Sequence, residues 1–349
     1  MATLKEIGAE LGLSPATVSR ALNGFPEVNK NTVDRVREVA ERLGYRPNRV
    51  AQRLVTGRSG MVGLIIKIRA DMSADQTFFE MLTGLTAALG AQDTDLVLAV
   101  DQDDDPVLPY RKLMERDILD GFILNAPVPE DPRVAFLQEK GIPFVMHGQT
   151  APDVDYACFG IDNAAVSADA VRLLTSLGHK RIALINGQSR YAFSVDRLRG
   201  FTTAMEAEGL SVPAAFMASD AETETHGYTH ALEMLAGRDG PSPTAFVCAS
   251  TLVAAGVMRA VKDRGLTVPG DVSVMGHDDA LPLTQARDLE PALTVTRAPL
   301  RDACQPLAEL LVAHVKGAPA EQRIERAELI VRASTGPAPK GGETPWLST

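Results

Sequence analysis

Apolar side chains recur at helical spacing through the first 43 residues, and this spacing predicts three short helices. Each helix presents one apolar face: Leu4, Ile7 and Leu11; then Val18, Ala21 and Leu22; then Val33, Val36, Val39, Ala40 and Leu43. Gly12 separates the first helix from the second, as the tight turn between them requires. Three helices that share one small core predict a helix-turn-helix.

The outer side of the second helix carries small and polar side chains. Arg20 can donate two hydrogen bonds to a guanine edge, and Ala16 offers a methyl group to a thymine methyl. Polar residues around them can bind phosphates and fix the register on DNA. The residues that we expect to contact DNA in this head are Thr3, Ser14, Pro15, Ala16, Thr17, Ser19, Arg20, Asn23, Asn29, Thr32 and Tyr45. The alternative is an ordinary helical hairpin with incidental polar residues.

The stretch GYRPNRVAQRL at 44–54 predicts a hinge helix that enters a DNA groove. Asn48 can cap this helix, and Arg49 and Arg53 can bind phosphates. The helix is too short to be stable alone in water. An apolar wedge can open a base step in the minor groove, and Leu54 is the candidate. The hinge residues expected to contact DNA are Asn48, Val50, Ala51 and Leu54, and the alternative is a basic linker.

From residue 60 onward, short apolar runs alternate with helical stretches. Strands are predicted at 61–68, 95–100, 121–126, 142–147, 181–187, 244–250 and 272–278, with helices at 78–90, 109–116, 132–140, 163–177, 194–208 and 251–264. This βα rhythm, which restarts near residue 163, predicts an α/β body of two lobes, each built on a doubly wound parallel sheet. Ligands of such sheets bind beyond the carboxyl ends of the strands, so we expect a cleft there.

Several candidate ligand-binding residues follow the predicted strands or begin helices: Phe78, Phe79, Asn125, His147, Arg197, Ser250 and Asp278. Carboxylate, guanidinium and amide groups bind vicinal hydroxyls in pairs, and an aromatic face covers the C–H side of a pyranose. The set therefore favours a sugar ligand. As alternatives, Asp278 caps a helix, Phe78 or Phe79 belongs to the core, and His147 is a satisfied polar residue of the cleft wall.

Charge is distributed unevenly along the 349 residues. Residues 1–60 carry ten basic and six acidic side chains, which is a net charge of +4. Because the whole chain has a net charge of −10, residues 61–349 carry −14. A basic head on an acidic body confines attraction for phosphate to one end. Neither an export signal nor a segment of membrane-spanning length is recognisable, and we expect a cytoplasmic protein without membrane contact.

Chemistry-bearing motifs of enzymes are missing from the sequence. We find no P-loop, GxGxxG, Ser-His-Asp order or metal-ligand spacing, so we expect neither a cofactor nor a metal. Cys158, Cys248 and Cys304 stand apart and are expected to be buried thiols. His226 and His230 lie four residues apart on a possible helix and are expected at the surface.

The segments TLKEIGAELGLSPATVSRALNG, GYRPNRVAQRL and TGRSGMVGLI together resemble the lactose-repressor (LacI) family of bacterial transcription regulators. The resemblance implies an effector-contacting role for Arg197 in RLRGF and for Asp278 in GHDD, and a sugar-hydroxyl contact for Asn125. Two positions depart from the family pattern, with Ser250-Thr251 in place of Asn-Asp and His147 in place of an acid. Gly8 replaces the usual alanine and is expected to soften the first helix.

Other segments, MATLKEI, DLVLAVDQDDDP, DGFILNAPVPEDPR and GIPFVMHG, resemble regulators of α-glucoside uptake operons. The resemblance implies a homodimer that binds pseudo-palindromic operator DNA and responds to a mono- or disaccharide. The expected organisation is a head (1–47), a hinge (48–59), a body (60–336) and a flexible tail (337–349). Within the body, the first lobe is expected at 60–160 and 293–322, and the second at 161–292 and 323–336.

Two functions other than operator control are open at this stage. One is a sugar-binding protein or carbohydrate enzyme, and measurable turnover of a carbohydrate would support it. The other is a nucleoid-type DNA binder without operator preference. Retention on a specific site at 200 mM salt separates a regulator from such a binder, because non-specific binding collapses with salt.

Overall fold

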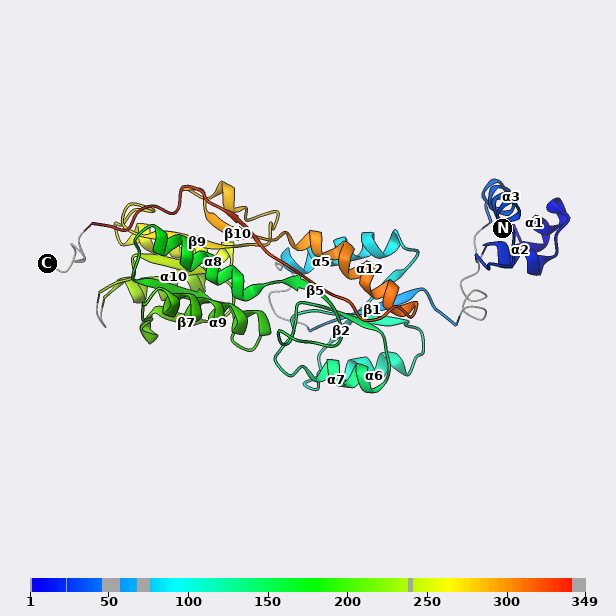
Figure 1. Cartoon of the computed structure of the whole chain (residues 1–349), viewed down its shortest axis with the longest axis horizontal. Coiled ribbons are helices and arrows are strands. Elements are labelled where there is room, and N and C mark those ends of the chain that lie inside the picture. Colours follow the sequence, from blue (N-terminus) through cyan, green and yellow to red (C-terminus); the bar gives the residue numbers. More distant parts are fainter. Residues whose placement is uncertain (1, 23, 46–56, 68–75, 238–240, 341–349) are drawn as a thin grey trace. The chain divides into compact units, whose positions relative to one another are not determined.

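The computed structural model describes residues 2–22, 24–45, 57–67, 76–237 and 241–340 (Figure 1). Contacts divide the chain into two compact units, Met1–Gly60 and Met61–Thr349, which we call the head and the body. Five predicted DNA contacts lie outside the described residues: Asn23, Asn48, Val50, Ala51 and Leu54.

The head contains the three predicted helices, α1 (Leu4–Leu11), α2 (Pro15–Leu22) and α3 (Lys30–Arg42). Their apolar faces enclose one small core, in which Ile7, Val18 and Val36 are fully buried. Helix starts are fixed by side chains: Thr3 and Glu6 form a capping box at α1, and Asn29 accepts hydrogen bonds from two backbone amides of α3.

Gly8 has a packing role that the sequence pattern did not indicate. A Cβ atom at this position would lie 2.5 Å from the carbonyl oxygen of Leu13, whose amide donates to the Gly8 carbonyl oxygen at 2.8 Å. Gly12 ends α1 in the left-handed conformation at φ 69°. The turn therefore closes tightly onto α1, so Gly8 permits a close approach as well as lowering helix propensity.

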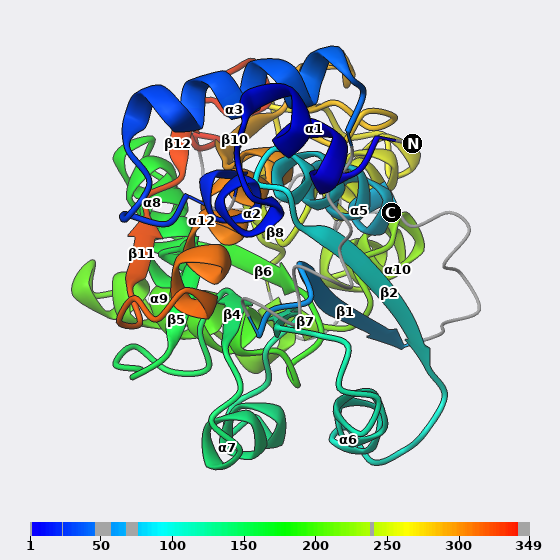
Figure 2. The same cartoon turned by 90° about the vertical axis from the view of Figure 1, so that its right-hand side faces the viewer.

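The first lobe is built on a six-stranded parallel sheet of order β11-β5-β4-β3-β1-β2. Its strands are β1 (Met61–Lys67), β2 (Asp95–Asp101), β3 (Gly121–Leu124), β4 (Phe144–His147), β5 (Ala157–Ile161) and β11 (Gln322–Glu325). Helices α5 (Gln76–Gly90) and α12 (Cys304–Val315) cover one face, and α6 (Leu108–Met114) and α7 (Pro132–Glu139) cover the other (Figure 2).

The second lobe repeats this plan, with the order β12-β10-β9-β8-β6-β7. Its strands are β6 (Ile182–Asn186), β7 (Met217–Ser219), β8 (Ala245–Cys248), β9 (Ser273–Asp278), β10 (Thr294–Arg297) and β12 (Glu328–Ile330). Only β12 is antiparallel to its described neighbour. Helices α8 (Asn163–Ser176) and α9 (Ala192–Ala207) pack on one face, and α10 (Glu224–Leu235) and α11 (Thr251–Asp263) on the other.

The segments that return between the lobes differ from the predicted boundaries. Strand β10 (Thr294–Arg297) pairs with β9 in the second sheet, so the chain re-enters the first lobe after 297 and not at 293. Strand β11 (Gln322–Glu325) pairs with β5, so the first lobe extends to 325. Both strands have only four residues, and their lobe is decided by pairing with distant strands, which local periodicity does not report.

The described residues test two smaller expectations, on the cysteines and on His226. Cys158, Cys248 and Cys304 are buried and unpaired, as predicted. The prediction for His226 was wrong, because its ring is buried on α10 with Nε2 3.2 Å from the carbonyl oxygen of Asn186. Among the helices in the described part of the chain, none has the length and apolarity needed to cross a bilayer.

Candidate DNA-binding face and inter-lobe site

Helix α2 divides into a buried side and an exposed side, as its sequence pattern predicts. Val18 and Ala21 are fully buried, whereas Pro15, Ala16 and Arg20 are exposed. The side chains expected to read bases therefore point away from the core of the head. Thr17 and Ser19 are half-buried between the two sides.

Three of the predicted DNA-contacting residues also cap helices. The Ser14 hydroxyl accepts a hydrogen bond from the Thr17 amide at 3.1 Å, and Asn29 Oδ1 accepts from the Asn31 amide at 2.8 Å. Thr3 accepts from the Glu6 amide at 3.3 Å. These caps leave exposed helix N-termini, where the partial positive charge of the helix dipole favours phosphate.

Thr32 and Tyr45 occupy different surroundings from the caps. Thr32 is half-buried in the first turn of α3, and its backbone amide donates a hydrogen bond to Asn29 Oδ1 at 3.4 Å. Tyr45 is half-buried against the core of the head. An aromatic body packed in this way leaves only its polar end for a phosphate contact.

In the body, the carboxyl ends of both sheets meet. Pro127, which follows β3, accepts a hydrogen bond from the amide of Ala192, which follows β6, at 2.9 Å. A second contact between the lobes joins the Leu283 amide to Gln76 Oε1 at 2.8 Å. We call the region around these contacts the inter-lobe site, because the strand ends that favour ligand binding lie there in both lobes.

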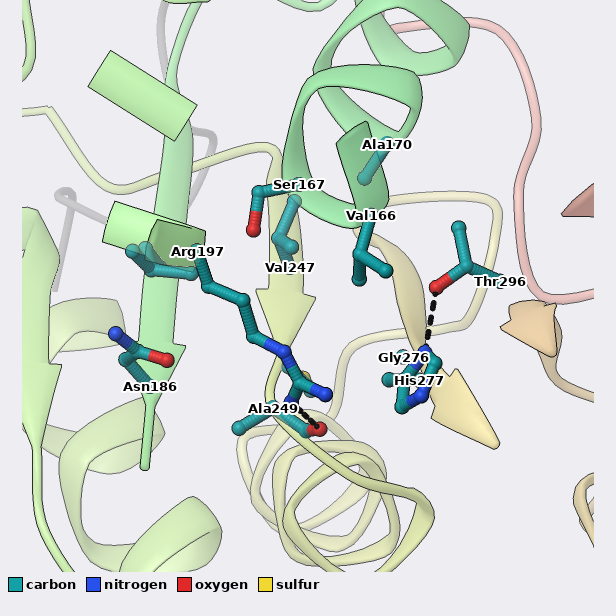
Figure 3. Close-up of a pocket in the computed structure, with 12 residues that line it drawn as sticks. Val166, Ser167, Ala170, Asn186, Arg197, Val247, Ala249, Gly276, His277 and Thr296 are labelled. Atoms are coloured by element: carbon teal, nitrogen blue, oxygen red, sulfur yellow. Dashed lines mark hydrogen bonds between the residues drawn. The ribbon is translucent and has the colours of Figure 1, made fainter. Parts of the chain in front are cut away.

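Arg197 is buried and held rigidly at this site. Its Nε donates to Asn163 Oδ1 at 2.9 Å. Its Nη1 donates to the carbonyl oxygen of Ala249 at 2.8 Å, a bond that Figure 3 shows as a dashed line. The guanidinium carbon lies 5.5 Å from the centre of the Phe193 ring. Two hydrogen bonds and an aromatic contact thus fix one guanidinium group that was predicted from the sequence.

A small cavity adjoins Arg197 inside the second lobe. Its volume is about 10 Å³, and Asn186, Arg197, His277 and Thr296 are among its lining residues (Figure 3). His277 Nδ1 lies 3.0 Å from Thr296 Oγ1. The cavity is at the lower limit for one water molecule, so it is too small to be the binding site of a sugar.

His147 and Asp279 form an electrostatic link between the two lobes. Burial lowers the pKa of His147 at the end of β4, and the charge of Asp279 opposes that shift. Burial alone would raise the pKa of Asp279, but His277, Arg197 and His147 outweigh it and hold that pKa below its usual value. Burial and, after it, Arg197 lower the pKa of His277, whose Nε2 lies 3.5 Å from Asp279 Oδ1.

The other predicted residues of the site have visible structural roles. Asp278 is buried at the end of β9, where Oδ1 accepts from the Ala280 amide at 2.8 Å and Oδ2 lies 3.7 Å from Arg297 Nε. It therefore stabilises a turn and not a helix start. Ser250 caps α11 by accepting from the Val253 amide at 3.3 Å, while Asn125, half-buried after β3, accepts through its backbone from Arg133 at 3.1 Å.

The two adjacent phenylalanines are not equivalent. Phe78 packs against the first-lobe core, as the core alternative expects, whereas 49% of Phe79 is exposed. Their rings meet edge to face with centres 5.3 Å apart. Neither residue has a described contact with Arg197, His147 or Asp279.

Several polar and aromatic residues of the site escaped the sequence-based prediction: Asn186, Tyr191, Phe193, Glu222 and Asp279. Tyr191 and Phe193 stack in parallel with ring centres 5.4 Å apart, at the start of α9. Asp279 is the second aspartate of GHDD and could have been found from that motif. Glu222 lies after β7, a three-residue strand that the periodicity did not reveal.

Comparison with known proteins agrees with this architecture. Residues 3–48 match the family described as bacterial regulatory proteins, lacI family, and 171–335 match a periplasmic binding protein-like domain. The regulator AglR of Rhizobium meliloti is 41% identical over 345 residues, which cover 98% of this chain and 96% of AglR. The regulator RafR of Escherichia coli is 33% identical over 84% of this chain and 86% of its own.

Solved structures resemble the whole chain as well. A complex of the transcriptional regulator CelR with cellobiose has a TM-score of 0.70 at 27% identity, covering 96% of this chain and 100% of CelR. The lac repressor dimer bound to operator has a TM-score of 0.75 at 22% identity, with 96% and 99% covered, and shares the fold. With 41% identity to a regulator across nearly its entire length, the chain belongs to the LacI family of bacterial transcription regulators, which bind DNA and are not enzymes.

Proposed function

We propose that this regulator is a homodimer that binds a pseudo-palindromic operator and changes its operator affinity when a mono- or disaccharide, in the first instance an α-glucoside, occupies the inter-lobe site. The observation that carries the sugar part is the rigid Arg197 guanidinium beside ionised Asp279, with the stacked Tyr191 and Phe193 next to it. Charged groups bind vicinal hydroxyls, and aromatic rings cover apolar sugar faces. CelR, which matches 96% of this chain in structure, forms a complex with cellobiose.

The DNA part depends on the exposed side of α2. Arg20 is its only basic residue, so we assign it the bidentate contact to a guanine, and Ala16 the contact to a thymine methyl. We assign phosphate contacts to the helix N-termini that Ser14 and Asn29 cap. Two heads related by a twofold axis would read two half-sites of opposite orientation.

Exposed apolar side chains support the homodimer. Phe79 on α5 and Val100 on β2 are 49% and 52% exposed, and Leu283 in the second lobe is 83% exposed. Strand β2 is also an edge of the first sheet. A second copy of the chain packed against such side chains would bury them on both subunits at once.

Regulation requires that the sugar bind two arrangements of the lobes with different affinity, because an effector shifts an equilibrium only by that difference. We propose that closure of the lobes around the sugar changes the spacing of the paired hinges at 48–59. If the hinges form the helices that the sequence predicts, each would gain stability from the other and from the opened minor groove, so a change in their spacing would alter operator affinity.

A two-stage binding experiment tests the proposal. Thermal unfolding of the full chain is measured with maltose, sucrose, trehalose, cellobiose and their component monosaccharides, and each stabilising sugar is then added to an operator titration at 200 mM salt. We expect an α-glucoside to raise the unfolding temperature and to change specific operator affinity. Stabilisation by no sugar, or an operator affinity that ignores every stabilising sugar, would contradict the proposal.

A further inference from the structure

Glu222 lies between β7 and α10 with its carboxylate against the backbone of the second lobe. A Cβ atom at Gly187, directly after β6, would lie 2.5 Å from Glu222 Oε1 and 2.9 Å from Ser194 Oγ. The carboxylate thus occupies space that exists only because residue 187 has no side chain. Gly187 and Ser194 belong to the loop and first turn that follow β6, which places Glu222 at the carboxyl edge of the second sheet.

Oxygen atoms around this position lack hydrogen-bond donors. Among the described residues, no hydrogen bond or ion pair engages the Glu222 carboxylate. Ser194 Oγ and Asn186 Oδ1 are buried and also without a partner in the described part of the chain. Buried oxygens that lack partners carry a desolvation cost, and a ligand that brings donors removes it. Two such oxygens, beside the half-buried Glu222 carboxylate at one strand end, indicate a site for a hydroxyl-rich molecule.

Charged and titratable groups surround Glu222 from several elements: Arg197 on α9, Asp279 after β9, His226 on α10, Asp220 in its own loop, and His147 of the first lobe through Asp279. Burial raises the pKa of Glu222 from 4.5 to about 7, Arg197 opposes that shift, and Asp279 adds to it. The carboxyl group is therefore about half ionised at neutral pH in the free protein.

We propose that Glu222 is a specificity-determining effector contact, whose ionised carboxylate accepts hydrogen bonds from ligand hydroxyls beside Ser194 and Asn186. The inference rests on the proposed sugar effector and names one group that recognises it. Burial already disfavours the charged form of Glu222 in the free protein, and hydroxyl donors of the ligand add charge-assisted hydrogen bonds that the free protein lacks. A ligand without vicinal hydroxyls gains nothing at this position.

Proton release accompanies binding in this account. Donors to the carboxylate stabilise its charged form, so the ligand lowers the pKa of Glu222 below 7 and expels a proton from the molecules that carried one. Affinity consequently rises with pH between 6 and 8, about tenfold for each unit by which the ligand lowers that pKa.

Calorimetric titration of the full chain with maltose, sucrose, trehalose and cellobiose tests this. Each titration is run at pH 6.0, 7.0 and 8.0 in phosphate and in Tris, whose different ionisation enthalpies reveal protons released on binding. The wild type is expected to release protons at pH 6.0–7.0 and to bind more tightly at pH 8.0. Glu222→Gln is expected to bind at least tenfold more weakly at pH 8.0, with no pH dependence from this position.

Two further variants make the test specific. Gly187→Ala is expected to reproduce the loss, because its Cβ displaces the flexible end of Glu222 while leaving the acid in the chain. Glu224→Gln, two residues away, changes an exposed carboxylate paired with Arg259 and is expected to bind as the wild type does. Wild-type affinity and proton release in Glu222→Gln, or proton uptake by the wild type, would overturn the role of Glu222 but not the proposed sugar effector. A wild type that binds none of the sugars would overturn the sugar effector as well.

Discussion

The head and the body present their functional residues in opposite ways. In the head, the expected base-reading residues lie within a single eight-residue helix and are exposed next to a buried core. In the body, the residues of the inter-lobe site follow β4, β6, β7 and β9, and most are partly or fully buried. A DNA-reading surface must present its side chains to a large rigid partner, whereas a small-molecule site must desolvate its charges. The difference shows which parts of the function a linear pattern can reveal.

The largest effect that separates the two units is expected from a cavity in the small core of the head. Ile7→Ala removes a fully buried side chain and should cost about 2–5 kcal/mol. Because this is a large share of the stability of so small a unit, operator binding should be lost while sugar binding persists. Leu64→Ala, equally buried in the body, is the matched control and should lower the unfolding temperature of the body instead. Loss of sugar binding in Ile7→Ala would show that the units do not fold separately.

Removal of the buried guanidinium should have the next largest effect and should be confined to the body. Arg197→Ala leaves Asp279 without the charge of Arg197 and Ala249 without a donor, so sugar affinity should fall about 100-fold, equivalent to about 3 kcal/mol. Operator affinity without sugar should not change. Arg199→Ala on the same helix, where the arginine is exposed and paired with Asp196, serves as the control. Unaltered sugar affinity in Arg197→Ala would remove this residue from the site.

In the head, a single exposed side chain should change specificity more than stability. Arg20→Ala should cost about 1–3 kcal/mol at one base pair per half-site and relax preference there. Competition between operators that differ at each position measures the change. Arg37→Ala removes the same charge from α3 and should leave base preference intact. A uniform loss across all sequences in Arg20→Ala would identify Arg20 as a phosphate contact.

The smallest expected effect is on the pH dependence of the free energy of unfolding, and it concerns Glu222 in the body. Glu222 has a pKa of about 7 when folded, above its ordinary 4.5, so the folded chain holds more protons between these values. The contribution of Glu222 to the free energy of unfolding is fully present below pH 4.5 and is lost as pH rises through 7. Because the side chain is only half-buried, we expect the loss to be about 1–2 kcal/mol. Glu222→Gln should therefore be more stable than the wild type at pH 8 relative to pH 5, as measured by urea unfolding. If the free energy of unfolding depended on pH equally in both proteins, the Glu222 carboxyl group would be solvated in the folded chain and the prediction would be wrong.

Local periodicity predicted the three helices of the head and, in the body, α5, α6, α7, α8, α9, α11 and seven strands. It gave no prediction for α12 or for β5, β7, β10, β11 and β12. Val18 and Arg20 fell on opposite sides of α2 because helical spacing alone decides that outcome. Arg197 and Asp278 were found from short motifs at the ends of regular elements. The sequence also indicated two lobes, since the βα rhythm restarts near α8.

Features that depend on distant pairing or on a neighbouring backbone were missed. Strand β10 joins the second sheet through β9, and β11 joins the first through β5, so neither lobe boundary is written in local composition. Glu222 becomes part of the site because Gly187 leaves room for it, 35 positions earlier in the chain. Such a complementarity between two loops has no periodic pattern.

The coupling between the two units is tested most directly by one titration. Affinity of the full chain for its operator is measured at 200 mM salt with and without the tightest-binding sugar of the maltose, sucrose, trehalose and cellobiose set. Our account predicts a specific, symmetric protected site whose affinity changes about 5- to 150-fold with sugar in the wild type and not in Arg197→Ala. An operator affinity that stays the same with saturating sugar, or a symmetric site that never forms, would contradict it.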